Sequence, residues 1–224
     1  MLPPGPAVTW PGSLRVPAGR YVPADAIRCA WRTFSAGLGG GARGYAADLA
    51  SPGRVRALAA QVRAEVPRRD VLAGNAGAGS GAPGRTRQVS ADGHERRFAV
   101  SYLAPVLLTR LLVPLLTASA PSRAASAGSL GQVPFDPAGA GFEHRYNGVD
   151  AYRRSKLALA AFTVALAGQL DPAQVTVNCL HPATFMNTAM VARSKGSAQR
   201  EPEHAVQGAI GVGEVVTPGS WPRR

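Results

Sequence analysis

The sequence has too few cysteines for a disulfide framework. Cys29 and Cys179 are the only two in 224 residues, and two cysteines do not make a metal set either. The four histidines lack the paired spacing of a metal site. The N-terminus lacks a basic segment followed by an apolar core, so we expect no signal peptide. These absences predict a cytoplasmic protein without a metal ion.

Acidic residues and lysines are also scarce. Thirteen Asp and Glu stand against 25 Lys and Arg, which gives a formal net charge of +12, and only Lys156 and Lys195 are lysines. This charge alone would allow a nucleic-acid surface. The arginines are scattered, however, and aromatic residues make up only 6%. We therefore do not expect nucleic-acid binding, which a steep salt dependence of DNA binding would reveal.

No apolar run has the length of a membrane span. The longest, Leu103 to Ala118, contains Arg110 and two prolines, whereas a span needs roughly 20 apolar residues. We therefore expect no membrane segment.

The middle of the chain shows alternating helix and strand patterns. Its length and its hydrophobic content of 46% suit one α/β domain. Helices are predicted over residues 54–66, 93–103, 105–116 and 151–170, and strands over residues 45–49, 70–73, 124–129 and 175–180. This alternation indicates a parallel sheet with helices on both faces. Residues 1–24 and 194–224, rich in Pro, Gly, Ser and Arg, should be poorly ordered around a core of residues 43–193.

The last predicted helix carries the most informative pair of residues. Asp150 is a typical N-cap, and proline ends the helix near Asp171-Pro172. Tyr152 and Lys156 are four residues apart and therefore project from the same face. An ammonium close to a phenol lowers its pKa, so the tyrosine could act as a general acid or base. The apolar residues Leu157, Ala160, Ala161, Val164 and Ala165 are spaced by three and four and therefore lie along one face of this helix.

An isolated Tyr-x-x-x-Lys is most often just two surface residues, so other features must decide. Ligands of a parallel sheet bind beyond the carboxyl ends of its strands. Asp48, Asn75-Ala76-Gly77, Ser129 and Pro182 all follow predicted strands. Each also has a simple structural explanation, as a helix cap, a tight turn, a loop hydroxyl or a strand end. Ser129 with Lys156 as base could alternatively serve a hydrolase, which a serine-reactive probe would test.

Residues 39–44 match the spelling G-x-G-x-x-G of a phosphate-binding loop. Such a loop needs a helix directly after it, so that backbone N–H groups point at the phosphate. Residues 45–49 instead favour a strand. We therefore do not interpret this match as a phosphate site.

Together these motifs resemble the short-chain dehydrogenase/reductase family over residues 45–191, with most similarity to retinol-dehydrogenase-like members. The resemblance implies a Rossmann-like, doubly wound parallel sheet, a bound NAD or NADP and a small carbonyl or alcohol substrate. It implies that Tyr152 transfers the proton, that Lys156 lowers the tyrosine pKa and holds the ribose, and that Ser129 polarises the substrate oxygen. Ser101 occupies the position of the helix asparagine that completes the family's catalytic set. The implied cofactor-binding residues are Asp48, Leu49, Asn75, Ala76, Gly77, Tyr152, Lys156, Pro182 and Phe185.

The sequence departs from the family pattern at both ends. No Gly-rich turn is recognisable about 40 residues before Asp48, where a βαβ unit would place it. Gly74 replaces the first asparagine of the Asn-Asn-Ala-Gly turn, and Ala183 replaces the glycine after Pro182. The segment after Val191 resembles nothing in the family. The expected sheet is therefore incomplete at both ends.

Two functions follow from this resemblance. The first is an NAD(P)-dependent oxidoreductase that interconverts a carbonyl and a secondary alcohol. The alternative is a catalytically impaired relative that acts only as an oligomer partner, and cofactor titration separates the two. Helices 105–116 and 151–170 form a dimer interface in the resembling family, and Ala158, Ala161, Ala165 and Gly168 would permit close helix contact. We therefore expect a homo-oligomer.

Overall fold

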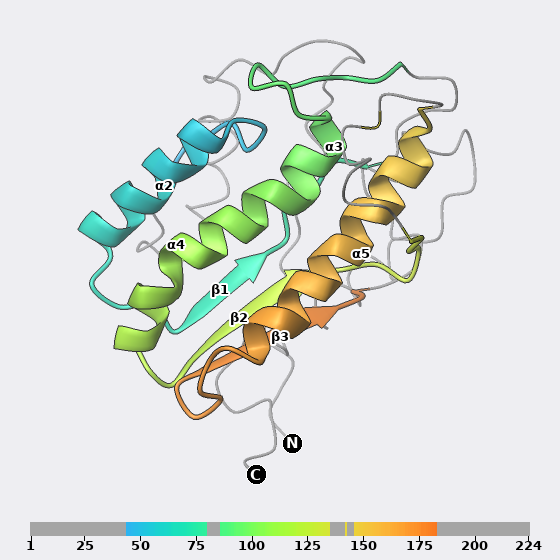
Figure 1. The fold of residues 1–224 in the computed structure, drawn as a ribbon. Coiled ribbons are helices and arrows are strands. Elements are labelled where there is room, and N and C mark those ends of the chain that lie inside the picture. Colours follow the sequence, from blue (N-terminus) through green and yellow to red (C-terminus); the bar gives the residue numbers. More distant parts are fainter. Residues whose placement is uncertain (1–43, 80–85, 135–141, 143–145, 183–224) are drawn as a thin grey trace, which may run out of the picture. The chain divides into compact units, whose positions relative to one another are not determined.

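The computed structural model describes residues 44–79, 86–134, 142 and 146–182. The chain divides into two compact units, Met1–Ala47 and Asp48–Arg224, and all helices and strands named below belong to the second. The expectations for residues 1–24, 39–43 and 194–224 lie outside the described residues. The elements in chain order are α2 (Pro52–Glu65), β1 (Val71–Gly74), α3 (Arg96–Phe98), the π-helical turn η1 (Ala99–Leu103), α4 (Ala104–Ala118), β2 (Ser122–Ala127), α5 (Gly148–Ala167) and β3 (Val175–Leu180) (Figure 1).

The three strands form a parallel sheet in the order β1-β2-β3. Leu72 of β1 is paired with Ala124 of β2, which is paired in turn with Val177 of β3. The central strand consists of Ser, Arg and Ala, which are weak strand formers. Its backbone nevertheless bonds to a neighbour on both sides, and this pairing outweighs the low intrinsic preference. The strand expected at residues 124–129 begins and ends two residues earlier, so Ser129 lies beyond its carboxyl end.

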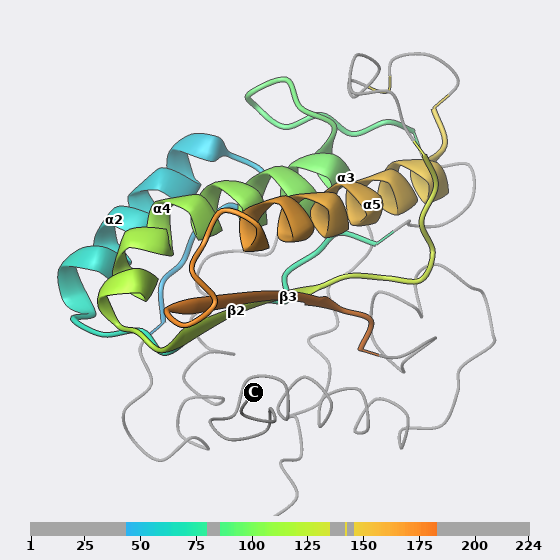
Figure 2. The same ribbon diagram turned by 60° about the horizontal axis from the view of Figure 1, so that its bottom comes forward.

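Helices α2, α4 and α5 lie side by side on one face of the sheet, as Figure 2 shows. The connections from β1 to β2 through α4 and from β2 to β3 through α5 follow the usual handedness of parallel crossovers. No helix covers the opposite face within the described ranges. The sequence predicts helices on both faces of the sheet, and the described residues show them on one face only.

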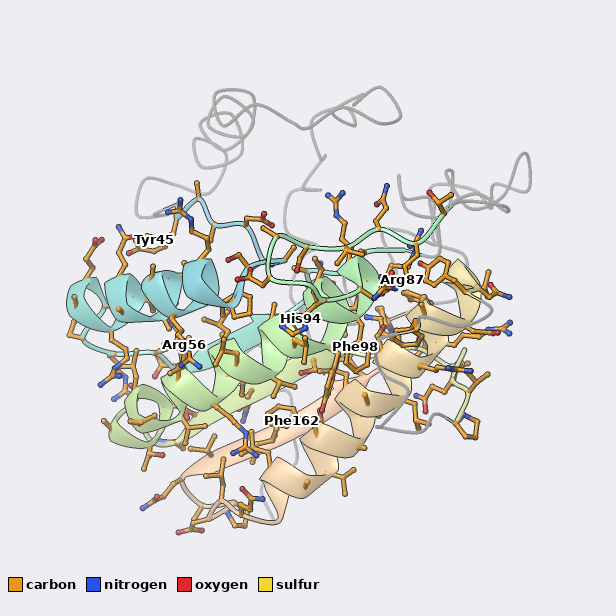
Figure 3. All side chains as sticks on the ribbon, turned by 45° about the horizontal axis from the view of Figure 1, so that its top comes forward. Tyr45, Arg56, Arg87, His94, Phe98 and Phe162 are labelled. Carbon is orange, nitrogen blue, oxygen red and sulfur yellow. The ribbon has the colours of Figure 1, made fainter. Side chains whose placement is uncertain are left out.

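Apolar side chains fill the space between this helical layer and the sheet. Leu116 of α4 is fully buried and packs with Ala124 and Val175. A second group joins Leu159, Phe162 and Leu166 of α5, and a third joins Phe98, Phe142, Ala151 and Ala158. Phe98 and Phe162 lie between the ribbons of α4 and α5 (Figure 3). These contacts fix where the start of α5 lies relative to α3 and η1.

Helix α5 differs from expectation in its boundaries. It begins at Gly148, and the N-cap is Asn147, whose side-chain Oδ1 accepts from the Val149 amide at 2.9 Å. Asp150 lies in the first turn instead. Its carboxylate there interacts favourably with the helix dipole but does not cap the helix. The helix ends at Ala167, before the expected stop at Asp171-Pro172.

The buried face of α5 is a different one from the apolar face noted in the sequence. The side chains that face the core are Ala151, Ser155, Lys156, Ala158, Leu159, Phe162, Thr163 and Leu166. On the apolar face noted in the sequence, Leu157 and Ala160 are half-buried, Ala161 and Ala165 are exposed, and Val164 is 74% exposed. The helix is apolar on both sides, so its periodicity could not distinguish the inner face from the outer one.

The helices expected at residues 93–103 and 105–116 form one helical stretch, Arg96–Ala118, of 23 residues. Pro114 does not break it, because this proline is exposed near the C-terminal end and water can donate to the Arg110 carbonyl in place of the missing amide. By length and composition the stretch could cross a membrane, contrary to the expectation from the shorter run. Of its most apolar window, 33% is buried inside the protein. Core helices pass the same test of length and composition, so the test by itself assigns no membrane span.

Candidate active site

Tyr152, Lys156 and Ser129 meet beyond the carboxyl end of β2. Lys156 is buried, and its ammonium donates to the Ala127 carbonyl at 2.7 Å. The same ammonium lies 5.6 Å from the centroid of the Tyr152 ring. The hydroxyls of Ser129 and Tyr152 share a hydrogen bond, and Ser129 Oγ also accepts from the Gly131 amide at 3.1 Å. The fold therefore brings together three residues that the sequence separates by up to 27 positions.

Burial dominates the charge states of this group. It raises the pKa of Tyr152 above the usual 10.0, and the hydrogen bond from Ser129 acts in the opposite direction. Burial likewise lowers the pKa of Lys156, against the effect of the nearby Cys179. The expectation that Lys156 lowers the pKa of Tyr152 is therefore not met in this structure. The ammonium lies over the ring and is held by Ala127, while loss of water disfavours the phenolate.

Gly128 allows β2 and β3 to approach each other just before Ser129. Its amide donates to the Leu180 carbonyl at 2.7 Å. A Cβ at this position would lie 2.7 Å from Cys179 Sγ, which is too close for any side chain. The absence of a side chain at residue 128 thus lets the chain turn from the strand into the loop that carries Ser129.

The loop after β1 follows the same edge of the sheet. Asn75 and Ala76 are exposed, and Gly77 is half-buried. Ser101 is fully buried in η1, and its Oγ accepts from the Ala78 amide at 3.0 Å and donates to the Ala78 carbonyl at 3.3 Å. Ser101 therefore holds this loop, and its hydrogen bonds in the described residues do not extend to Tyr152 or Lys156.

Asp48 and Leu49 do not follow a strand. Residues 44–48 have no regular structure, so the strand expected at residues 45–49 is wrong. Asp48 accepts from the Ala50 amide at 2.9 Å, because the chain turns here into α2. Leu49 lines a largely apolar cavity of about 260 Å³ between α2 and α4. Val55 and Ala99 line the same cavity, whereas Tyr152 and Lys156 do not.

Pro182 is half-buried and lies two residues beyond the end of β3. Phe185, the remaining expected cofactor residue, lies outside the described residues. Within the described part of the chain, no group of three or more His, Cys, Asp or Glu side chains could hold a metal ion.

No pattern in the sequence predicts the polar cluster that Glu95, Arg97 and Tyr146 form in the fold. Arg97 Nη1 lies 3.3 Å from Glu95 Oε1, with 6% and 0% of the two side chains exposed. Tyr146 donates to Glu95 Oε1 at 2.8 Å and accepts from Arg97. Arg97 Nε donates to the Gly79 carbonyl at 3.0 Å. Glu95 and Tyr146 are 51 positions apart in the sequence. Charged residues at the start of a helix are usually exposed to solvent, so burial of Glu95 and Arg97 was not expected.

Comparison with known proteins decides the family. A sequence model of the family described as short chain dehydrogenase matches residues 24–199. This chain belongs to the short-chain dehydrogenase family. The resemblance stated from the motifs is thus confirmed, and the match runs through both compact units of the chain.

Its relatives in this family include retinol dehydrogenases. Human retinol dehydrogenase 14 (Homo sapiens) is 43% identical over 139 residues, which cover 60% of this chain and 40% of that protein. Human retinol dehydrogenase 12 is 36% identical, with 60% of this chain and 42% of the relative covered. The chain thus spans about 40% of the length of the curated relatives that it matches.

Solved structures show the same fold. The Pseudomonas aeruginosa RhlG/NADP active-site complex superposes with a TM-score of 0.64 at 24% identity, covering 89% of this chain and 79% of that one. A metagenomic short-chain oxidoreductase in complex with NADP gives a TM-score of 0.60 at 26% identity, covering 88% and 76%. The predicted Rossmann-like α/β fold is therefore confirmed for this short-chain dehydrogenase.

Proposed function

We propose that this chain is an NAD(P)-dependent oxidoreductase that interconverts a carbonyl and a secondary alcohol. The observation that carries the proposal is the meeting of Tyr152, Ser129 and Lys156 beyond the end of β2. Membership of the short-chain dehydrogenase family supports it, as do relatives named retinol dehydrogenases and a solved relative in complex with NADP.

The residues present fit a dinucleotide. Lys156 has three donors, and among the described residues only the Ala127 carbonyl accepts from it, which leaves two donors for ribose hydroxyls. The exposed backbone at Asn75 and Ala76, followed by the half-buried Gly77, lets a ligand approach the carboxyl end of β1 closely. We further assign Asp48 and Leu49 to the adenine side and Pro182 and Phe185 to the nicotinamide side. The nicotinamide, when bound, supplies or accepts the hydride.

Tyr152 transfers the proton in this mechanism. In the reductive direction its phenol donates to the oxygen of the carbonyl as negative charge develops there. Ser129 donates a hydrogen bond to the same oxygen and polarises it. Lys156 stabilises the negative charge that proton donation leaves on Tyr152. Because burial raises the pKa of Tyr152, the phenol is protonated at neutral pH, which favours reduction over oxidation there.

We propose an apolar carbonyl or alcohol as the substrate class, because the relatives at 36–43% identity named above are retinol dehydrogenases. The cytoplasmic location and the single-domain organisation stay predictions from the sequence.

The test uses the full chain in two measurements. Titration with NADH and NADPH, followed by fluorescence, measures binding of the dinucleotide. Reduction of all-trans-retinal then measures turnover in the parent, in Tyr152→Phe and in Tyr102→Phe, a control that removes a phenolic hydroxyl elsewhere on the helical layer. Tyr152→Phe should lower turnover by about 10²–10⁴, the usual contribution of a general acid, and keep dinucleotide affinity within about twofold.

Two results would contradict the proposal. Retention of the parent's rate by Tyr152→Phe would show that the active-site assignment is wrong. A folded parent that binds neither NADH nor NADPH would replace the oxidoreductase with the non-catalytic alternative. If the parent reduces the substrate, Tyr102→Phe should do so at the same rate.

A further inference from the structure

Three segments of the chain meet where the buried Glu95 and Arg97 contact the half-buried Tyr146, a cluster that we call the latch. Glu95 and Arg97 belong to the start of the helix that continues through η1 and α4. Arg97 Nε bonds to the Gly79 carbonyl in the loop after β1. Tyr146 directly precedes Asn147, the N-cap of α5. The latch therefore links the loop at the proposed cofactor site to the entry of the helix that carries Tyr152 and Lys156.

The hydrogen bonds of the latch leave little freedom to its members. Glu95 Oε1 accepts from Tyr146 at 2.8 Å and lies 3.3 Å from Arg97 Nη1. Its other oxygen, Oε2, accepts from the Phe98 amide at 2.8 Å. The Tyr146 hydroxyl both donates to Glu95 and accepts from Arg97, so it completes the bonding of a buried ion pair. Such a pair is held firmly only when further hydrogen bonds satisfy its members.

The loop after β1 is held at two consecutive residues. Ser101 bonds to both backbone groups of Ala78, and Arg97 bonds to the carbonyl of Gly79. Ser101 can only hold the loop to η1. Arg97, through Tyr146, also connects the loop to α5.

We propose that Tyr146 is a positioning residue that couples the loop after β1 to the start of α5, so that dinucleotide binding orders the segment leading to Tyr152. This inference rests on the proposed function. Burial and the bond to Glu95 raise the pKa of Tyr146 to about 12, so its hydroxyl keeps the proton that it donates to Glu95 at neutral pH.

Tyr146→Phe removes the hydroxyl and keeps the ring. The matched control is Ser119→Ala, which also removes a buried hydroxyl with two hydrogen bonds, to the Arg69 amide at 2.8 Å and the Leu115 carbonyl at 2.7 Å. Ser119 follows α4 and precedes β2, so it lies at the opposite end of that strand from Ser129. Thermal unfolding of both variants checks that each is folded and gives the general loss of stability.

Hydrogen exchange of the full chain without dinucleotide reads the latch directly. Tyr146→Phe should accelerate amide exchange at residues 75–79 by about five- to tenfold, the effect of losing one net hydrogen bond. Ser119→Ala should leave exchange in this loop at the parent's rate. Unchanged exchange at residues 75–79 in Tyr146→Phe would overturn the coupling, whatever the chain binds.

Hydrogen exchange with saturating NADPH then tests whether dinucleotide binding protects the start of α5. In the parent, NADPH should slow exchange at residues 146–150, and Tyr146→Phe should lose this protection while its dissociation constant for NADPH rises about fivefold. Protection that persists in Tyr146→Phe overturns the proposal. If the parent binds NADH instead of NADPH, the same experiment is done with NADH. A parent that binds neither fails the proposed function instead, and the exchange without dinucleotide still decides the structural coupling.

Discussion

The Ser129 hydroxyl has two partners, the Gly131 amide and the phenol of Tyr152. The bond to the Gly131 amide holds the loop beyond β2. The bond to Tyr152 lowers the pKa of that phenol, which burial raises. The same hydroxyl is positioned to polarise the substrate oxygen. Ser129 therefore affects both the substrate and the protonation state of the residue that transfers the proton.

Ser129→Ala should consequently have two effects. Turnover should fall by about 10²–10³, the usual cost of losing a donor to a developing oxyanion. The rate of alcohol oxidation should also require higher pH. Tyr152 accepts a proton only when deprotonated, so a further rise in its pKa lowers the active fraction at any given pH. The measurement is the pH profile of kcat/KM for oxidation in the parent and the variant. Ser129→Thr, which keeps a hydroxyl, should retain the parent's profile, and an unshifted profile in Ser129→Ala would contradict this role.

Residue types, spacing and the resemblance to the family together indicated the candidate catalytic group. Tyr152 and Lys156 share a helix face, and Ser129 follows a strand, so the rule for parallel sheets places them together. The direction of the pKa shift could not be found in this way, because burial depends on the whole fold. The latch was missed for a related reason: only the folded chain brings Tyr146 to Glu95.

At the scale of elements, the inner faces of α4 and α5 should contribute more to the free energy of unfolding than their outer faces. Leu116 of α4 is fully buried against Ala124 and Val175, whereas Val164 of α5 is 74% exposed. Leu116→Ala should lower the free energy of unfolding by about 2–5 kcal/mol, because it removes buried methyl groups and leaves a cavity. Val164→Ala should change it by no more than about 0.5 kcal/mol. Urea denaturation followed by circular dichroism measures both.

A comparable loss of stability in the two variants would mean that the outer face of α5 is covered in solution. The sequence could not show which face of α5 is buried, since an alanine-rich helix has apolar residues on every side. The strands were easier to assign when β-branched residues marked them, as in β3. Strand β2 was located less accurately, because small residues carry little strand preference and its place at the centre of the sheet is a tertiary property.

At the scale of the molecule, the outer surface of α4 and α5 carries apolar residues next to the exposed Arg110. Ala161 and Ala165 are exposed beside Val164, and Leu108 and Leu111 of α4 are only half-buried. Ala158, expected at the interface, instead packs inside the protein. A large exposed apolar surface favours association of protein chains. The homo-oligomer expected from the sequence therefore stays a prediction, with Ala161 rather than Ala158 near its contact.

Sedimentation equilibrium at micromolar concentration tests this prediction. The parent should be at least a dimer, and Ala161→Arg should dissociate it without loss of helical content, because residue 161 is exposed in the single chain. Ala57→Arg places the same charge at an exposed position of α2 and should leave the assembly intact. A parent that sediments as a folded monomer would show that this surface has another use.

The π-helical turn η1, in which the Ala104 amide bonds to the Ala99 carbonyl, contains one residue more than an α-helical turn. Each helical residue rotates the chain by about 100°, so this extra residue sets the angle between the start of the helix and α4. Both sides of the turn have fixed partners, since Arg97 bonds to Gly79 and Leu116 packs on Ala124. Deleting one residue from the turn would restore regular hydrogen bonding but rotate one side away from its partners. Insertions and deletions should therefore be far more damaging here than substitutions.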